Sequence, residues 1–458
     1  MAVAPVPPLA GHQLLIFLLQ LLALLGLAFG LGRVATRLKM PAIVGELLAG
    51  VVLGPSLLGS LAPGFSHWLL PSDPSQVHLL DAAGQIGVLL LVGVTGSHLD
   101  MGLLRRRRAT AARISLAGLL VPLGLGIGLG FVLPASLLPA HAHRVVFAMF
   151  IGVAMCVTAI PVIAKTLSDL RLLHRDVGQL ILSASLIDDT AGWFLLSVVS
   201  ALATIGVSTG TLSRSVLYLI GFVAFAFIVA RPLVHRAMRL ADRSSQSGPT
   251  IAITVITILV GAAATQAMGM EAIFGAFIAG IVVGAPNAAN QRKLAPLRVV
   301  VLWLLAPLYL ASAGLRMNLT TLASSGTALA ALAMLAVAIL GKFSGAYLGA
   351  RVSRLGKWES LAVGAGMNSR GVVEIIIAMA GLRLGILTTS TFTSVILVAI
   401  VTSLMAPPLL RMALARVAHN GEERLRLATH DAWADHPPEP DHSPEPDHSP
   451  EPVLAAAA

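Results

Sequence analysis

Two adjacent aspartates, Asp188 and Asp189, lie inside a long apolar stretch, QLILSASLIDDTAGWFLLSVVSALATIG. A charged carboxylate at membrane depth costs about 2.5–3.5 kcal/mol on insertion scales, so such pairs seldom persist without a use. A carboxylate in this position can take either a proton or a metal cation. The pair therefore indicates ion exchange, and the rest of the sequence has to supply a scaffold for it.

The composition predicts a polytopic membrane protein. Hydrophobic residues make up 56% of the 458 residues and charged residues only 11%, and the mean hydropathy is +0.87. A span needs roughly 20 apolar residues, so this length allows about a dozen crossings. The single Cys156 excludes a disulfide framework and a cysteine metal site. The first residues carry no basic segment, so we expect no cleaved signal peptide.

Thirteen apolar segments can be separated, near residues 13–34, 42–60, 79–98, 110–132, 144–167, 177–204, 213–234, 249–267, 270–286, 297–315, 325–349, 357–382 and 390–413. Alternate loops hold 24 basic residues on one side and 4 on the other. Because cytoplasmic loops are the basic ones, we expect a cell inner-membrane protein with its N-terminus outside and its C-terminus in the cytoplasm. The net charge of +10 therefore reports topology rather than a nucleic-acid partner.

Two segments share a glycine pattern. GELLAGVVLG at 45–54 and GAFIAGIVVG at 275–284 both space their glycines as G-x4-G-x3-G. By the loop charges the two spans run in opposite directions, which is the mark of inverted-topology repeats in secondary transporters. Small residues also recur wherever membrane helices pack closely, which is the alternative explanation.

Two spans look interrupted near their middles. The span at 144–167 contains Thr158 and Pro161, and the span at 357–382 contains the run NSRG followed by Glu374. Proline removes a backbone donor, and glycine among polar groups permits unwinding. If the breaks face each other, Arg370 and Glu374 can neutralise the opposed helix dipoles. A proline kink without any site is the alternative.

The chain changes character near residue 418. The tail contains a repeated Glu-Pro-Asp-His-Ser-Pro unit, which cannot form a packed core, so we expect residues 418–458 to be a disordered cytoplasmic tail. Weak metal binding or pH sensing by His436, His442 and His448 is the alternative.

The motifs together resemble the monovalent cation:proton antiporter superfamily, in the branch of bacterial sodium/proton and potassium/proton exchangers and plant cation/proton exchangers. The resemblance covers about residues 12–415. It is carried, in order, by PAIVGELLAGVVLGPSLLG (41–59), TAIPVIAKTL (158–167), LIDD (186–189), FGAFIAGIVV (274–283), APLYLASAGLRMNL (306–319), GKFSGAYLGAR (341–351) and GMNSRGVVEIIIA (366–378).

The resemblance implies a role for several residues. Asp189 matches the family's shared proton and cation carrier, and Asp188 matches the aspartate that pairs with a lysine of the eleventh span, here Lys342. Thr158 matches a polar residue beside the ion site and so a further ligand of the alkali cation. Arg370 and Glu374 match charged residues of the other broken helix.

The resemblance also implies an all-α antiporter fold of thirteen transmembrane helices, with inverted repeats and two discontinuous crossing helices. Residues 1–106 would form dimerisation helices 1–3, residues 107–206 core helices 4–6 with the ion site, and residues 207–320 linker helix 7 and dimerisation helices 8–10. Residues 321–417 would form core helices 11–13. The implied partners are a monovalent cation, protons, the lipid bilayer and a second copy in a homodimer, with no cofactor.

Some positions depart from the pattern. The run NSRGVVE is closer to potassium-associated and plant-like members, so the sequence leaves Na⁺ or K⁺ open. We interpret Glu271 as interfacial rather than functional. For Glu46 we favour capping of a helix start over a role in ion access.

The sequence-level hypothesis is exchange in which Asp189 holds a proton or a cation, but not both. The Asp188–Lys342 pair would open when a cation binds, which favours two protons per cation and electrogenic transport. The alternative from another class is a channel-like or sensory protein whose carboxylates gate or hold a bundle. No nucleophile elbow, phosphate loop or histidine metal spacing is present, so we expect no enzyme.

Overall fold

The computed structural model describes residues 10–97, 108–159, 175–205, 209–284 and 288–417, apart from 39, 72, 242 and 245, together with residues 163, 166, 167, 172 and 423. Within these residues the chain is helical and contains no strand. The tail predicted to be disordered lies almost wholly outside them.

The helices follow the apolar segments of the sequence. In chain order they are α1 Gly11–Arg37, α2 Ala42–Leu53, α3 Leu58–Leu61, α4 Pro63–Leu69, α5 Pro74–Ser97, α7 Arg108–Val132, α8 Arg144–Cys156, α10 Asp176–Ile205, α11 Thr209–Phe225, α12 Arg231–Ala241, α13 Gly248–Ala267, α14 Ala272–Val283, α15 Ala288–Val300, α16 Ala306–Leu315, α17 Ser325–Val352, α18 Lys357–Met367, α19 Val372–Arg383 and α20 Thr389–Leu414. Single π-helical turns, Ala226–Ala230 and Val301–Leu305, join α11 to α12 and α15 to α16.

Ten of the described helices are long and apolar enough to cross a membrane. The pair α18 and α19, bent by 43° at its break, makes an eleventh span. Two shorter apolar helices, α8 and α14, lie where the sequence predicts the fifth and ninth spans. The helical membrane architecture is as expected, whereas thirteen as a count stays a prediction.

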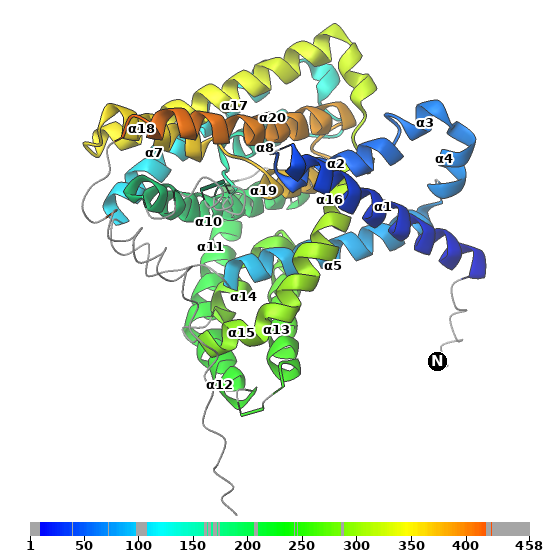
Figure 1. The fold of residues 1–458 in the computed structure, drawn as a ribbon, viewed down its shortest axis with the longest axis horizontal. Helices are drawn as coiled ribbons and strands as arrows, with labels where there is room; N and C mark the ends of the chain where they lie inside the picture. The colour runs from blue at the N-terminus through cyan, green and yellow to red at the C-terminus, as the bar shows by residue number, and fades with distance from the viewer. Residues whose placement is uncertain are drawn as a thin grey trace, which may run out of the picture.

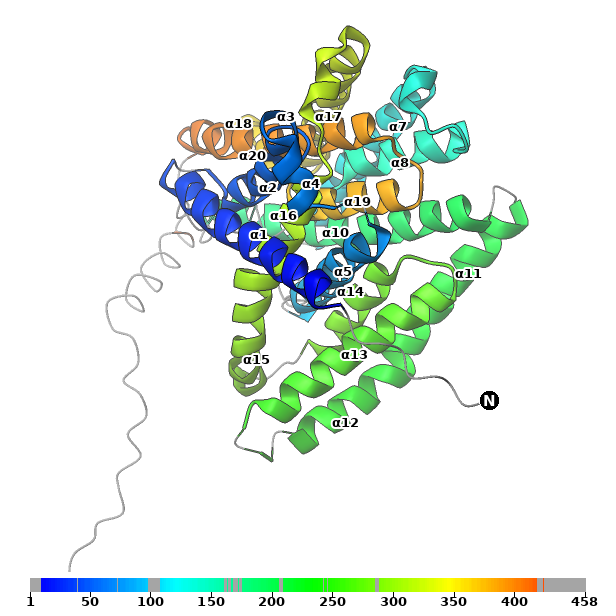
Figure 2. The ribbon, with the colours of Figure 1, turned by 90° about the vertical axis from the view of Figure 1, so that its right-hand side faces the viewer.

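The helices pack as two bundles, which Figure 1 shows side by side. We call α7, α8, α10, α17, α18, α19 and α20 the core bundle, because each packs on others of this set. We call α1, α2, α5, α13, α14 and α16 the panel bundle for the same reason. Figure 2 shows α11, α12 and α13 on the side of the molecule away from α17 and α18. Close approaches between the bundles include α10 with α14 and α16 with α19.

The repeated glycines allow helices of the panel bundle to touch. A Cβ at Gly45 would collide with the backbone of α1 at Leu31, and one at Gly275 with α13 at Gly261. One pattern position later in each helix, a Cβ at Gly50 would meet α16, and one at Gly280 would meet α5 at the Gly93 carbonyl oxygen. The α2 glycines thus contact the first and tenth predicted spans, and the α14 glycines contact the eighth and third. If spans 1, 2 and 3 correspond to spans 8, 9 and 10, each contact of α2 has a counterpart at α14. This correspondence supports the inverted repeat over chance recurrence of glycine.

Substituting Gly280 by alanine tests the helix approach. The new methyl group must push apart two backbones, so we expect destabilisation at the upper end of the ~1–3 kcal/mol typical of overpacking. Gly26→Ala is the matched control, because a Cβ at Gly26 meets nothing within 4 Å. Thermal unfolding of the detergent-purified protein should show a lower melting temperature for Gly280→Ala only. Equal melting temperatures would contradict the proposed contact.

Candidate ion site

Helix α10 carries both aspartates into the middle of the core bundle. Asp188 is 0% exposed and Asp189 is 1% exposed. Ser185, one turn earlier on the same helix, is also buried and approaches the sulfur of Met367 at 3.4 Å. Because residues three and four apart share a helix face, this contact directs the face bearing both carboxylates toward the end of α18.

Asp188 is held by side chains of several helices. Lys342 of α17 forms an ion pair with its Oδ2 atom, and both side chains are fully buried. The hydroxyl of Ser115 on α7 donates to Oδ1. The hydroxyl of Thr158, just beyond α8, lies 3.1 Å from Oδ2. A buried carboxylate tolerates its charge only when paired and hydrogen-bonded in this way.

The two interrupted spans meet at this point. Helix α8 ends at Cys156 and residues 157–159 are not helical, whereas α18 ends at Met367 and α19 begins at Val372. The Thr158 hydroxyl lies 3.0 Å from the Met367 carbonyl oxygen, so it donates there or to Asp188. The backbone N–H of Ala159 donates to the Ser369 carbonyl at 3.2 Å. Pro161, the residue predicted to break the first span, lies outside the described residues.

Cationic side chains cover the C-terminal end of α8. Arg370 donates to the carbonyl oxygens of Ala154, at 2.7 Å, and Met155. Lys342 donates to the carbonyl of Cys156. These are the carbonyls that a helix terminus leaves unpaired, and they carry the negative end of its dipole.

The acidic partner of Arg370 lies at the start of α19. Glu374 is in the first turn of that helix, at its positive end, and accepts a hydrogen bond from Arg370 at 2.7 Å. Arg370 is 0% exposed and Glu374 is 1% exposed. The hydroxyl of Ser403 on α20 donates to the Arg370 carbonyl. These contacts are the ones that the predicted dipole neutralisation requires, and the role itself stays a prediction.

The structure therefore brings the predicted site residues together around one crossing. The residues of this set are Thr158, Asp188, Asp189, Lys342, Arg370 and Glu374. Sequence reasoning missed Ser115 and Ser403, because a lone serine in an apolar span has no spacing that separates it from ordinary helix packing. It also did not foresee that Lys342 would contact a helix end as well as Asp188.

Two side interpretations have different outcomes. Glu271, just before α14, forms an ion pair with Arg383 at the end of α19 at 2.7 Å, and its interfacial position stays a prediction. Glu46 does not cap α2: that helix starts at Ala42, has no acidic residue in its first turn and has no side-chain cap. The capping interpretation is wrong because Glu46 lies beyond the first turn, where its carboxylate no longer meets unpaired N–H groups. The three tail histidines lie outside the described residues.

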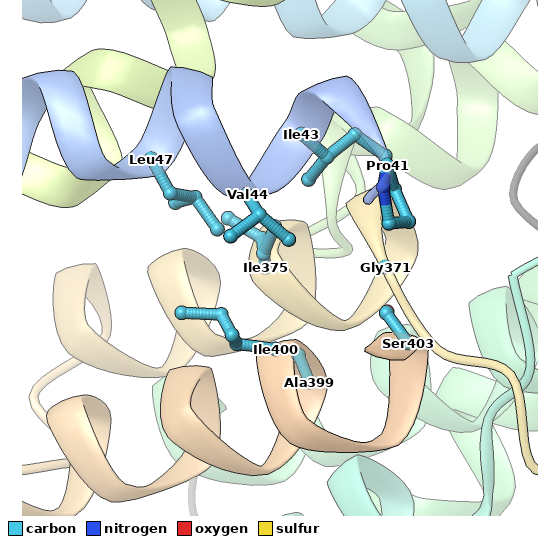
Figure 3. Close-up of a pocket in the computed structure, with 9 residues that line it drawn as sticks. All are labelled: Pro41, Ile43, Val44, Leu47, Gly371, Ile375, Ala399, Ile400 and Ser403. Atoms are coloured by element: carbon cyan, nitrogen blue, oxygen red, sulfur yellow. The ribbon is translucent and has the colours of Figure 1, made fainter. Parts of the chain in front are cut away.

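A small apolar pocket marks the boundary between the bundles near the break. Figure 3 shows Val44 and Leu47 of α2 on one side, with Ile375 of α19 and Ile400 of α20 opposite them. Ser403 of α20 and Gly371, in the break between α18 and α19, also line this pocket. The panel bundle therefore meets the core bundle here through apolar side chains that pack incompletely.

The donor set at the crossing suits an alkali cation better than a transition metal. Among the described residues, no group of three or more His, Cys, Asp or Glu side chains lies together. The available groups are carboxylate, hydroxyl and carbonyl oxygens, which are hard ligands.

Comparison with known proteins gives a consistent result. The family model described as "Sodium/hydrogen exchanger, transmembrane" matches residues 21–416. The chain belongs to this family. The resemblance seen in the sequence is thereby confirmed, and the family consists of transporters rather than enzymes.

Individual relatives cover the chain to different extents. The Na(+)/H(+) antiporter NhaS4 of Synechocystis is 31% identical over 89% of this chain and 99% of its own. The Cation/H(+) antiporter 17 of Arabidopsis thaliana is 31% identical over 87% of this chain, which spans about half (48%) of that longer relative. The solved sodium proton antiporter MjNhaP1 of Methanocaldococcus jannaschii has a TM-score of 0.66 and 17% identity over 91% of this chain and 99% of its own, which shows the antiporter fold.

Removing one partner of the buried pair tests the site. Lys342→Ala leaves the Asp188 carboxylate without its cation, so we expect a loss of about 3–5 kcal/mol of stability. The double variant Asp188→Asn with Lys342→Met removes both charges and should recover much of the loss. Unfolding of the purified variants measures both effects. Additive losses in the double variant would show that the two groups do not interact.

Proposed function

We propose that this protein is a secondary antiporter that exchanges an alkali cation, Na⁺ or K⁺, for protons by alternating access. The observation that carries the proposal is the crossing itself. A buried aspartate pair, one member already matched by Lys342, lies where two helix breaks meet. Asp188 is held by Lys342, Ser115 and Thr158, and Asp189 follows it on the same helix, 1% exposed. A buried carboxylate beside two helix breaks can bind a proton or a cation.

In this mechanism Asp189 holds either a proton or the cation, because both compete for one negative charge. Hydroxyl and carbonyl oxygens at the breaks, including that of Thr158, offset the dehydration of the cation. A loaded site is neutral and can cross the low-dielectric barrier, whereas an empty charged site is held back by its desolvation cost. That penalty couples the two ions and prevents leak.

The contacts between bundles support movement of the core as a unit. The ion pairs that are fully buried, Asp188–Lys342 and Arg370–Glu374, lie within the core bundle. Glu271 and Arg383, which join the bundles, have side chains 10% and 30% exposed. A sliding motion therefore breaks a partly hydrated pair and apolar contacts, and leaves the costly buried pairs intact.

Relatives are named as antiporters of Na⁺, of K⁺ or of both ions. The choice of cation, the inner-membrane location, the external N-terminus and the homodimer are part of the proposal. Exposed leucines of α1, such as Leu14, Leu18 and Leu22, offer an apolar face that either lipid or a second copy can cover.

The carrier role is tested by Asp189→Asn. We expect cation-driven proton flux in proteoliposomes to fall to the level of empty vesicles, because the amide binds neither a proton nor a cation with comparable strength. Asp73→Asn is the matched control, since this aspartate is exposed on a loop between α4 and α5. A folded Asp189→Asn protein that exchanges at the normal rate would refute the assignment and favour a structural or gating role.

The stoichiometry is tested by the membrane potential. If Lys342 releases a proton each time a cation opens its pair with Asp188, two protons move per cation and transport carries net charge. Exchange in voltage-clamped proteoliposomes should then accelerate or reverse with the imposed potential. Exchange that is indifferent to potential would indicate one proton per cation and a lysine that stays charged.

A further inference from the structure

Asn368 and Ser369, in the break between α18 and α19, are buried without side-chain partners. Both residues are 0% exposed. The amide nitrogen and amide oxygen of Asn368 have no hydrogen-bond partner among the described residues. The same holds for the hydroxyl of Ser369. Buried polar groups are nearly always satisfied, and exceptions call for a ligand, an ion or water at the site.

The backbone that carries these two side chains contacts the other helix break. The carbonyl of Met367, the residue before Asn368, lies 3.0 Å from the Thr158 hydroxyl, which also approaches Asp188. The Ser369 carbonyl accepts the Ala159 N–H. Residues 367–369 are therefore fixed against the other helix break, on the side that α10 faces.

The cationic groups nearby donate to other acceptors, and Nε of Arg370 has no hydrogen-bond partner among the described residues. Lys342 donates to Cys156 and Asp188. Arg370 donates through its two terminal nitrogens to Ala154, Met155 and Glu374. The Asn368 amide oxygen and the Ser369 hydroxyl oxygen are thus acceptors that the protein's own cations do not use.

We infer that Asn368 Oδ1 and Ser369 Oγ are ligands of the transported alkali cation and help to set its affinity and selectivity. This inference rests on the proposed function. Amide and hydroxyl oxygens are hard, neutral ligands, so they stabilise the cation without adding charge that would oppose its release. They complement the single charge of Asp189, and a bound cation would satisfy both oxygens.

The test compares two serines of the same span. Ser369→Ala removes a hydroxyl at the break, whereas Ser360→Ala removes a hydroxyl that is equally buried and equally unpartnered near the start of α18. Asn368→Ala and the near-isosteric Asn368→Leu remove the amide. Proton flux in proteoliposomes is measured against Na⁺, K⁺, Li⁺ and Rb⁺ separately, together with the thermal shift that each cation produces in the purified protein.

We expect Asn368→Ala and Ser369→Ala to raise the KM of the preferred cation about tenfold, equivalent to ~1.4 kcal/mol. The maximal rate should change less, the order of the four cations should change, and the cation-induced thermal shift should shrink. Ser360→Ala should match the parent protein in all of these. If Asn368→Ala does not fold, Ser369→Ala and Asn368→Leu carry the same comparison.

Two results would overturn the inference. In one, the folded Asn368 and Ser369 variants keep the KM and the cation order of the parent protein, and only the melting temperature measured without cation changes. These groups would then hold structural water. An equal change in Ser360→Ala would mean a general packing effect. Failure of the proposed function looks different, because then the parent protein and Ser360→Ala would show no cation-driven flux at all.

Discussion

The contact on which the structure depends is the one that Lys342 makes with two negative groups at once. Its ammonium group binds the Asp188 carboxylate and the last carbonyl of α8, at Cys156. Away from water, neither a carboxylate nor a bare helix end is tolerated alone. One lysine therefore joins three helices, α10, α17 and the broken α8. Any event that weakens its bond to Asp188 also alters the charge balance at the helix end beside the candidate ion site.

The scaffold around this contact follows a different principle. Panel helices α2 and α14 approach their neighbours through glycine, where backbone meets backbone and dispersion replaces the hydrophobic effect that is missing in lipid. The core bundle also uses glycine contacts, such as Gly345 of α17 against the Ala117 carbonyl of α7, and in addition keeps charged side chains inside. The boundary between the bundles includes apolar side chains and the partly exposed Glu271–Arg383 pair.

Much of this arrangement could be predicted from the sequence, because charged residues in apolar spans are energetically unfavourable unless they are paired. An aspartate pair, a lysine and an arginine in apolar spans each require a partner, and the repeated glycines indicate close helix contacts. The identities of Ser115 and Ser403 could not be predicted, since a serine hydroxyl in a membrane helix satisfies itself on its own backbone as readily as on a distant carboxylate. The prediction that Glu46 caps α2 was wrong for a related reason. Hydropathy locates a span but not the first turn of its helix, and capping depends on that turn.

Three of the four basic residues on the predicted outer side have local partners. Arg144 donates to carbonyls at the end of α7, Arg316 pairs with Asp81, and Arg383 pairs with Glu271. Arg383 differs from the other two because its partner belongs to the other bundle. In the proposed cycle it is a charge that must exchange a protein partner for water when the core moves, and its partial exposure keeps the cost of that exchange small.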